Sequence, residues 1–218
     1  MKRFFKHNGL SVILFICFIL PLIGQTITGL KEHNKQIIEE GGQQIGLQQY
    51  LSSGHFLQTT FENWESEFLQ MAFFVLFTIF LYQKGSSESK DPDEKEDVDK
   101  EPNPRKKDAP WPVKQGGWIL GLYKHSLTIA LFLLFILSFI AHLFGSLKDY
   151  NEEQLLKGNA TYTIGQYIGG SRFWFESFQN WQSEFLAVFT IVVLSVFLRQ
   201  KGSPQSKAVD ASMSHTGN

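Results

Sequence analysis

The sequence has little cysteine and none of the common catalytic motifs. Cys17 is the one cysteine among 218 residues and lies in an apolar run, so there is no disulfide framework and no cysteine-based metal site. The chain contains no Gly-x-Ser-x-Gly elbow, no His-Glu-x-x-His pair and no glycine-rich phosphate loop ending in Lys-Ser or Lys-Thr. Its six histidines show no metal-ligand spacing. These absences argue against an enzyme, and we expect no cofactor or metal.

Charge is balanced overall and segregated along the chain. There are 20 Lys+Arg and 21 Asp+Glu residues, and no basic stretch is long enough to follow a phosphate backbone, so nucleic acid is not an expected partner. Almost every charge lies outside four apolar runs, and many of the 21 Phe lie inside or beside these runs. This segregation predicts an all-α integral membrane protein, with the lipid bilayer as its main partner.

Two apolar runs are long enough to cross a bilayer unaided. Leu10 to Ile27 and Leu127 to Phe144 carry no formal charge, and each would span about 27 Å as a helix. Two shorter runs, Phe68 to Tyr82 and Phe185 to Leu198, suffice only if their helices begin upstream, where an aromatic stripe continues the apolar face. The sequence therefore predicts four spanning helices, at about residues 10–27, 62–82, 120–144 and 181–198.

A basic start before the first run also fits a secretory signal peptide, whose removal would leave three spans. The run is longer than a usual signal core, and Gly24-Gln25-Thr26 offers no clear small-x-small cleavage site. The same helix also recurs in mid-chain. We therefore favour an uncleaved first span.

The chain contains an internal duplication. Residues 10–90 align without a gap on residues 127–207, and about 30 paired positions are identical. The densest match pairs residues 61–69 with residues 178–186. Each copy is a two-helix unit that would cross the membrane twice, so the copies form parallel repeats that enter from the same side.

The distribution of basic residues predicts the orientation. Fifteen Lys and Arg lie in the termini, the central linker and the approach to the third span, whereas five lie in the two loops within the repeats. The positive-inside rule therefore places both termini in the cytoplasm.

The predicted organisation has four parts. Residues 1–84 form the first repeat and residues 118–202 the second. Residues 85–117 form a charged cytoplasmic linker, and residues 203–218 form a tail; both lack the apolar residues needed to offset their ordering entropy and should be disordered. We interpret the linker as a tether between the repeats, with a docking segment as the alternative.

Three segments resemble a known family. Residues 50–56, 61–71 and 83–90 are similar to a bacterial family of small multi-span membrane proteins, an uncharacterised domain of unknown function. The resemblance covers most of the chain apart from the linker and the tail. It implies the bacterial cytoplasmic (inner) membrane as the location, and it implies no activity, substrate or catalytic residue.

One polar pattern occurs in both copies near the outer end of the second helix. In each copy, Asn, Ser and Glu occupy positions i, i+3 and i+4, which lie on one face of a helix. The two copies could therefore bring two carboxylates together at the outer mouth of the four-helix assembly. The alternative is that these acids favour the helix dipole while Asn and Ser bond the nearby backbone. Glu62 and Glu65 are weaker candidates, because Gln179 and Gln182 replace them in the second copy. The candidate paired polar site comprises Asn63, Ser66, Glu67, Asn180, Ser183 and Glu184.

Two further sets of residues are assigned to the membrane boundary and to helix packing. His142 and its counterpart Gln25 keep a hydrogen-bonding side chain at the same level of the first helix, which favours a helix–helix bond over a proton relay. Aromatic residues at the ends of spans favour headgroup depth. The predicted interfacial aromatics are Tyr50, Phe61, Trp64, Tyr167, Phe178 and Trp181.

These observations favour a non-enzymatic structural or interaction module of the envelope. The alternative is a small transport-related unit for an ion or proton, which would use the paired carboxylates. Four spans enclose little room for a solute, so transport requires a homo-oligomer, whereas a structural role does not. A membrane enzyme ranks third, because His55 and Glu62 occur in the first copy only.

Overall fold

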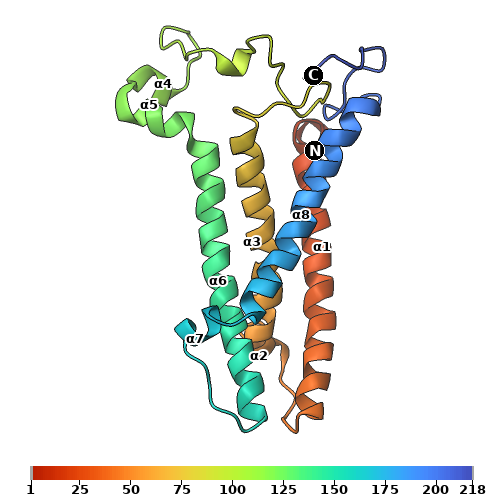
Figure 1. The fold of residues 1–218 in the computed structure, drawn as a ribbon, viewed down its shortest axis with the longest axis vertical. Helices are drawn as coiled ribbons and strands as arrows, with labels where there is room; N and C mark the ends of the chain where they lie inside the picture. Colours follow the sequence, from red (N-terminus) through yellow and green to blue (C-terminus); the bar gives the residue numbers. More distant parts are fainter. Residues whose placement is uncertain (1, 218) are drawn as a thin grey trace. The chain divides into compact units, whose positions relative to one another are not determined.

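The computed structural model describes residues 2–217, and no β-strand occurs among them, so the predicted all-α class is confirmed (Figure 1). Four helices are long. The elements are α1 (Lys2–Glu39), α2 (Leu47–Tyr50), α3 (Gly54–Phe77), the 3-10 turn η1 (Asp97–Asp99), α4 (Trp111–Gln115), α5 (Gly117–Lys124), α6 (Ser126–Leu156), α7 (Ile164–Ile168) and α8 (Arg172–Phe197).

The chain folds into two compact units. Unit 1 contains the chain up to Phe61 and the segment Ile140–Trp174. Unit 2 contains the segment Glu62–Phe139 and the chain from Phe175 onward.

In unit 1, the long helices α1 and α6 end in the same way. Gly41 and Gly158 follow these helices and adopt φ values of 84° and 75°, a backbone conformation that favours glycine. The N–H after each glycine returns to a carbonyl of the last turn, which caps the helix in a Schellman arrangement. These bonds join Gly42 N to Ile37 O (2.8 Å) and Asn159 N to Gln154 O (2.9 Å).

The loops that follow are held by equivalent asparagines. Asn34 on α1 exchanges two hydrogen bonds with the backbone of Ile45, at 2.7 and 2.9 Å. Asn151 on α6 does the same with Tyr162, at 2.7 and 3.0 Å. Residues 34 and 151, and residues 45 and 162, are paired positions of the duplication. The two copies therefore share this local structure as well as sequence.

Two glycines of unit 1 allow α3 and α6 to approach closely. A Cβ on Gly54 would lie 2.1 Å from the backbone N of Asp149, and a Cβ on Gly145 would lie 2.6 Å from the backbone N of Gln58. The first turns of α3 therefore contact α6 backbone to backbone.

In unit 2, aromatic rings connect α3, α6 and α8. Phe73 on α3 packs edge-on against Phe132 of α6, with ring centroids 5.8 Å apart, and lies 6.2 Å from Phe185 of α8. Phe135 of α6 also meets Trp181 of α8, at 6.4 Å. Helix α3 therefore has neighbours on two sides in this unit.

The start of the linker contacts the C-terminal tail, also within unit 2. Gly85 N donates to Thr216 Oγ1 (2.9 Å), and the hydroxyls of Ser86 and Ser195 lie 2.7 Å apart. A serine six residues downstream of the Gln in each Gln-Lys-Gly-Ser motif accepts that Gln's N–H. These bonds are Gln83 N to Ser89 Oγ (2.9 Å) and Gln200 N to Ser206 Oγ (2.8 Å). The disorder predicted for 85–117 and 203–218 stays a prediction.

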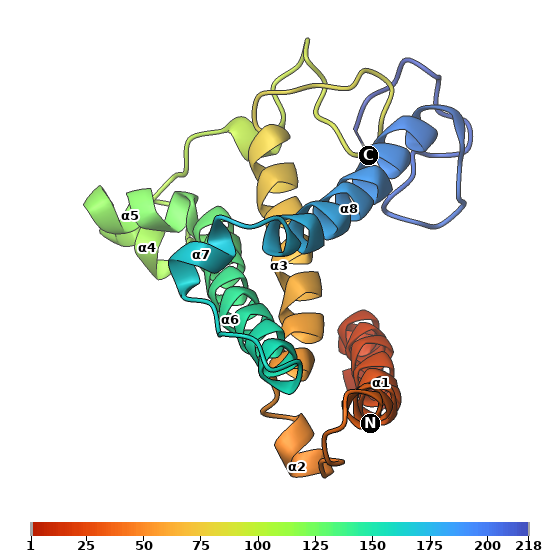
Figure 2. The ribbon, with the colours of Figure 1, turned by 60° about the horizontal axis from the view of Figure 1, so that its bottom comes forward.

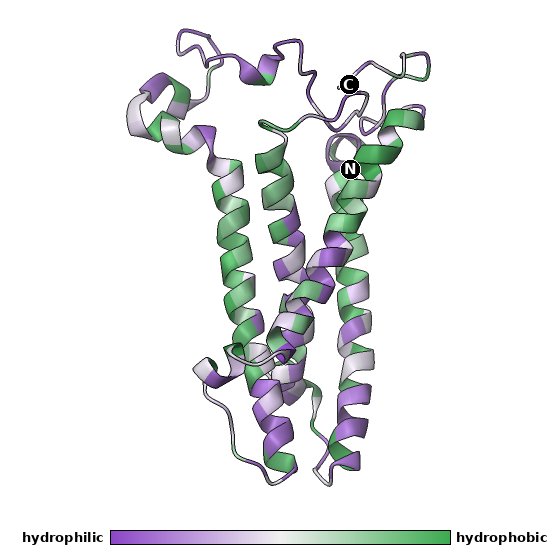
Figure 3. Ribbon diagram, in the orientation of Figure 1, coloured by the Kyte–Doolittle hydropathy of each residue, from purple (hydrophilic) through white to green (hydrophobic). Residues whose placement is uncertain are grey.

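Within residues 2–217, three helices are long and apolar enough to cross a membrane: α1, α6 and α8. Figure 3 shows the apolar stretches of α1 and α6 followed by turns of mixed purple and green toward their carboxyl ends. Their apolar windows are almost unburied, with shares of 0, 17 and 6% in α1, α6 and α8. Such surfaces require lipid or other apolar partners.

Helix α3 is not among these candidates, which departs from the four spans predicted. It ends at Phe77 rather than near residue 82, because Ile79 N and Phe80 N bond three residues back and tighten the chain out of the helix. Three carboxylates, Glu62, Glu65 and Glu67, also lie in its middle third. The third span begins later than predicted, at Ser126 rather than near residue 120, since α5 ends before His125 and α6 starts at Ser126.

Candidate functional site

Tyr50 is the centre of a buried polar cluster in unit 1. It ends the short helix α2 and is fully buried. Its hydroxyl reaches α1 at Gly29, where a Cβ would lie 2.2 Å from the oxygen. In the second copy, Tyr167 bonds Ser146, the residue equivalent to Gly29. Each copy thus packs its tyrosine against a small residue on its own first helix, with Tyr167 on α7 beside α6 (Figure 2).

Two histidines stack beside Tyr50. The rings of His33 on α1 and His55 on α3 lie 4.7 Å apart with 28° between their planes. The Tyr50 hydroxyl lies 3.2 Å from Nδ1 of His55. His33 is 7% exposed, and its Nδ1 makes no hydrogen bond among the described residues. Neither histidine is repeated in the second copy, where Tyr150 and Arg172 stand instead.

Arg172 joins the start of α8 to the end of α6. Its Nη2 donates to Asp149 Oδ2 (2.9 Å), and its Nη1 donates to Glu153 Oε2 (2.8 Å). The guanidinium carbon also lies 5.2 Å from the centre of the Tyr150 ring. Two acids one turn apart on α6 therefore hold a planar donor in a fixed orientation.

The polar cluster around Tyr50 shifts the pKa values of His55 and Tyr50, which lie outside the apolar runs. Burial, and then the positive charge of Arg172, lower the pKa of His55 below its ordinary value of 6.5. Burial, and then the negative charge of Asp149, raise the pKa of Tyr50 above 10.0. Both residues are therefore neutral at physiological pH, so His55 and Tyr50 can bond without a charge.

The lowered pKa of His55 predicts an acid-sensitive unit 1. The unfolded chain binds a proton at His55 more tightly than the folded chain does, so the free energy of unfolding falls as the pH drops through about 6.5. The groups around His55 are His33 from α1, Tyr50 from α2, Asp149 from α6 and Arg172 from α8. Thermal unfolding in detergent at pH 7.5 and pH 5.0 measures the effect.

Replacing His55 with Gln should reduce the loss of melting temperature between these two pH values, because Gln stays neutral. His215→Gln, in the C-terminal tail, is the matched control and should leave the loss unchanged. An equal pH dependence in wild type and His55→Gln would contradict the prediction.

In unit 2, the most deeply buried acid is Glu65 on α3, with no exposed surface. Trp181 Nε1 of α8 donates to its Oε1 at 2.8 Å. Because Gln182 replaces Glu65 in the second copy, sequence reasoning placed this acid among the weaker candidates. The signal that could have found it is its place beside the apolar stripe of α3, where a carboxylate needs a donor.

The predicted polar patch is partly engaged with backbone. Ser66 is buried and donates to the carbonyl of Asn63 (2.8 Å), and Asn180 donates to that of Glu176 (3.1 Å). Ser183 is exposed. These two backbone bonds match the alternative interpretation of the pattern, in which Asn and Ser bond nearby carbonyls.

The acids of unit 2 come near one another in two pairs. Glu67 is exposed and interacts electrostatically with the partly buried Glu184. Glu62 and Glu176 have carboxylate oxygens within 4.8 Å of each other. Sequence reasoning selected the first pair and missed the second, because Glu176 is paired with Thr59 rather than with an acid in the duplication.

The predicted interfacial aromatics divide by burial. Tyr50 and Tyr167 are 0 and 3% exposed and pack inside unit 1. Phe61, Trp64 and Trp181 are partly buried, and Phe178 is exposed. The headgroup depth predicted for all six stays a prediction.

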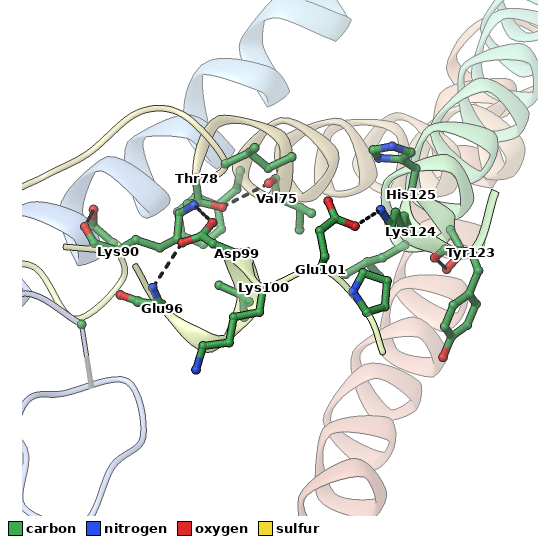
Figure 4. A pocket seen from close by; sticks show the side chains of 18 of the residues that line it. Val75, Thr78, Lys90, Glu96, Asp99, Lys100, Glu101, Tyr123, Lys124 and His125 are labelled. Atoms are coloured by element: carbon green, nitrogen blue, oxygen red, sulfur yellow. Dashed lines mark hydrogen bonds and ion pairs between the residues drawn. The ribbon is translucent and has the colours of Figure 1, made fainter. Parts of the chain in front are cut away.

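A cavity of unit 2 lies between the linker, the end of α3 and the start of α6 (Figure 4). Its volume is about 1260 Å³. Lys90 bonds Asp99 (2.6 Å) and Lys124 bonds Glu101 (2.7 Å) along its wall. The hydrogen bond between Lys90 and Asp99 raises the pKa of Lys90 and lowers the pKa of Asp99. Two acids of the linker, Asp99 and Glu101, are thus paired with lysines on this wall.

The sequence matches the family described as "Domain of unknown function (DUF6766)" over residues 1–218. The chain belongs to this family. No curated protein and no solved structure matches it. The family resemblance inferred from the sequence is therefore confirmed at the level of a domain of unknown function.

Proposed function

We propose that this DUF6766 chain is a four-span protein of the bacterial cytoplasmic membrane that acts as a non-enzymatic interaction module of the envelope. The observation that carries the proposal is the exposed apolar surface of α1, whose membrane-length window has no buried residue. A helix that its own chain leaves uncovered is available to lipid and to helices of other chains. Copies of the same chain are one such partner.

The fourth span in this proposal is α3. Helix α3 is less apolar than the other three, but Glu65 and Ser66 are turned away from solvent, and Glu65 has an indole N–H as donor. A polar helix is tolerated in a membrane when neighbouring helices satisfy its polar groups. Aromatic contacts with α6 and α8 in unit 2 support this position.

The topology has a direct test. Reporter fusions after Gln44, Asp97, Asn159 and Asn218 should read outside, inside, outside and inside, because both termini are cytoplasmic and each repeat crosses twice. A reversed pattern would contradict the orientation, and an inside reading at Gln44 alone would remove the first pair of spans. Size measurement in nanodiscs then reports whether copies associate.

A second candidate function is a cation- or proton-related role, supported by the electrostatic interaction between Glu67 and Glu184. If the two carboxylates act as a pair, Glu67→Gln and Glu184→Gln should be strongly non-additive in cation- or pH-dependent thermal stability in lipid. Independent acids near the helix start would instead give additive losses of about 0.3–1 kcal/mol each. Additivity would eliminate this candidate.

A further inference from the structure

Helices α4 and α5 form a bent segment next to the start of α6, within unit 2. Gly116 and Gly117 join the two short helices with φ values of 69° and 58°, which favour glycine. His125 lies between α5 and α6, so α5 does not continue into α6. Figures 1 and 2 show α4 and α5 to the side of the start of α6. We call residues 105–124, which include both helices, the elbow.

The elbow exposes large apolar side chains. Trp111 is 65% exposed, and Trp118 is 79% exposed. Leu122 lies one turn after Trp118 on the same face of α5 and is 52% exposed. A tryptophan combines an apolar ring with an N–H donor, so it favours the boundary between hydrocarbon and headgroups. The elbow therefore has the side chains of a segment that lies at a membrane surface.

Basic charge is concentrated in the same part of the chain. Residues 88–101 contain eight acids and three bases, whereas residues 102–124 contain five bases and one acid, Asp108. Lys124 is paired with Glu101. The other four bases are exposed, and among the described residues no acid forms an ion pair with them. They are Arg105, Lys106, Lys107 and Lys114.

A hydrogen bond brings these four bases together. Lys114 Nζ donates to the carbonyl oxygen of Lys107 (3.1 Å), so the charge of Lys114 lies beside residues 105–107. Ala109 and Val113, which lie between them in the chain, are each 8% exposed. The elbow thus turns two apolar residues inward and keeps its bases at the surface. We call the four bases the basic patch.

Helix α6 indicates what the elbow contacts. It is long and apolar enough to cross a membrane and begins at Ser126, two residues after the elbow ends at Lys124. When α6 crosses a bilayer, the elbow lies at headgroup depth. Anionic phosphates there complement the basic patch, and the boundary of the hydrocarbon covers the tryptophans. An acidic protein would match the charge alone, whereas lipid accounts for the position, the charge and the aromatic side chains together.

We propose that the elbow binds anionic phospholipid of the cytoplasmic leaflet, with the phosphates at the basic patch and with Trp111 and Trp118 between the headgroups. The inference rests on the membrane location in the proposed function. It goes beyond that function because it assigns a lipid class to a defined segment of the chain.

Hydrogen–deuterium exchange of the full chain in nanodiscs tests the proposal. The discs contain either phosphatidylcholine alone or a mixture of phosphatidylcholine and phosphatidylglycerol. The anionic lipid should slow exchange of the α5 amides at least about fivefold, because one basic residue near an anionic surface contributes a factor of about five. Unchanged exchange of α5 would overturn the proposal.

The amides of α6 separate this inference from the membrane location itself. Residues 127–139 should be protected in both kinds of disc, since a spanning helix is shielded from water. Unprotected α6 would contradict the membrane location and the lipid site together. Protected α6 with no response of α5 to anionic lipid would overturn the lipid site alone.

Two double variants test the charges. Lys106→Gln with Lys107→Gln should remove most of the slowing, because two of the four bases of the patch are lost. Lys95→Gln with Lys100→Gln removes the same charge from residues 88–101 and should leave the slowing unchanged. All four lysines are exposed, so the variants keep the packed residues. Equal effects of the two double variants would show a response to total charge and would overturn the proposal.

Trp118→Gln tests the apolar part of the surface. It should speed exchange of α5 in both kinds of disc, because its ring no longer holds the elbow at the hydrocarbon boundary. Val98→Gln is the control, since Val98 is 77% exposed and lies outside the elbow. Inorganic phosphate added to phosphatidylcholine discs should not slow exchange, because a free ion offers the tryptophans no surface. Slowing by phosphate, or unchanged exchange in Trp118→Gln, would overturn the proposal.

Discussion

Replacing Gly54 with alanine is expected to lower the free energy of unfolding by about 1–3 kcal/mol. The new Cβ would lie 2.1 Å from the backbone N of Asp149, 2.6 Å from its Cα and 2.8 Å from the carbonyl carbon of Lys148. All three are backbone atoms of α6, which cannot move aside as a flexible side chain can. The first turn of α3 must therefore separate from α6, and the buried groups between them lose contacts.

Gly145→Ala tests the same contact from the other helix. Its Cβ would meet Gln58 N at 2.6 Å and Leu57 Cβ at 2.7 Å. Gly24→Ala is the control, because no atom lies within 4 Å of the added Cβ, and alanine favours a helix interior. Equilibrium unfolding in detergent measures all three variants. Equal stability of Gly54→Ala and Gly24→Ala would show that α3 and α6 do not meet in this way.

Replacing Arg172 with glutamine is the second large expected effect, a loss of about 1–2 kcal/mol. The neutral amide of glutamine cannot bridge the carboxylates of Asp149 and Glu153 as the guanidinium does. Both partly buried acids therefore lose their charged partner. The side chain of Arg172 is 32% exposed, so solvent screening keeps the loss below that of a fully buried pair.

Arg172→Lys should recover only part of this loss, because an ammonium cannot bridge two carboxylates with the geometry of a guanidinium. Lys35→Gln is the control. Its ion pair with Glu32 is 3.8 Å long with both side chains well exposed, so its loss should stay below about 0.5 kcal/mol. Similar losses of unfolding free energy for Arg172→Gln and Lys35→Gln would contradict the stabilising role assigned to the ion pairs of Arg172.

The sequence predicted the helices of this chain better than their contacts. Apolar runs located α1 and α6, because the hydropathy of a membrane-length helix can be recognised from residues that are neighbours in the sequence. The end of α3 was misplaced, since the apolar run continues to Tyr82 while bonds to the third residue back begin at Ile79. Hydropathy alone does not contain that information.

The polar cluster around Tyr50 could not be predicted from the repeat. Identical residues in both copies indicate paired groups, but His55 and Arg172 occupy equivalent positions and differ. The partner of His55 on α1, His33, is 22 residues away, and the partner of Arg172 on α6, Asp149, is 23 residues away, so the pattern within one helix does not bring them together. The identical tyrosines, Tyr50 and Tyr167, were the available signal, and their depth in unit 1 was missed.

The ion pair between Glu40 and Lys157 has a consequence for symmetry. Residues 40 and 157 are equivalent positions of the two copies, and in unit 1 they face each other at 3.8 Å. Two identical copies would place either two carboxylates or two ammonium groups there, and like charges repel. The halves of this chain are therefore complementary rather than interchangeable. At this position, a single chain that carries both copies always supplies one acid and one base.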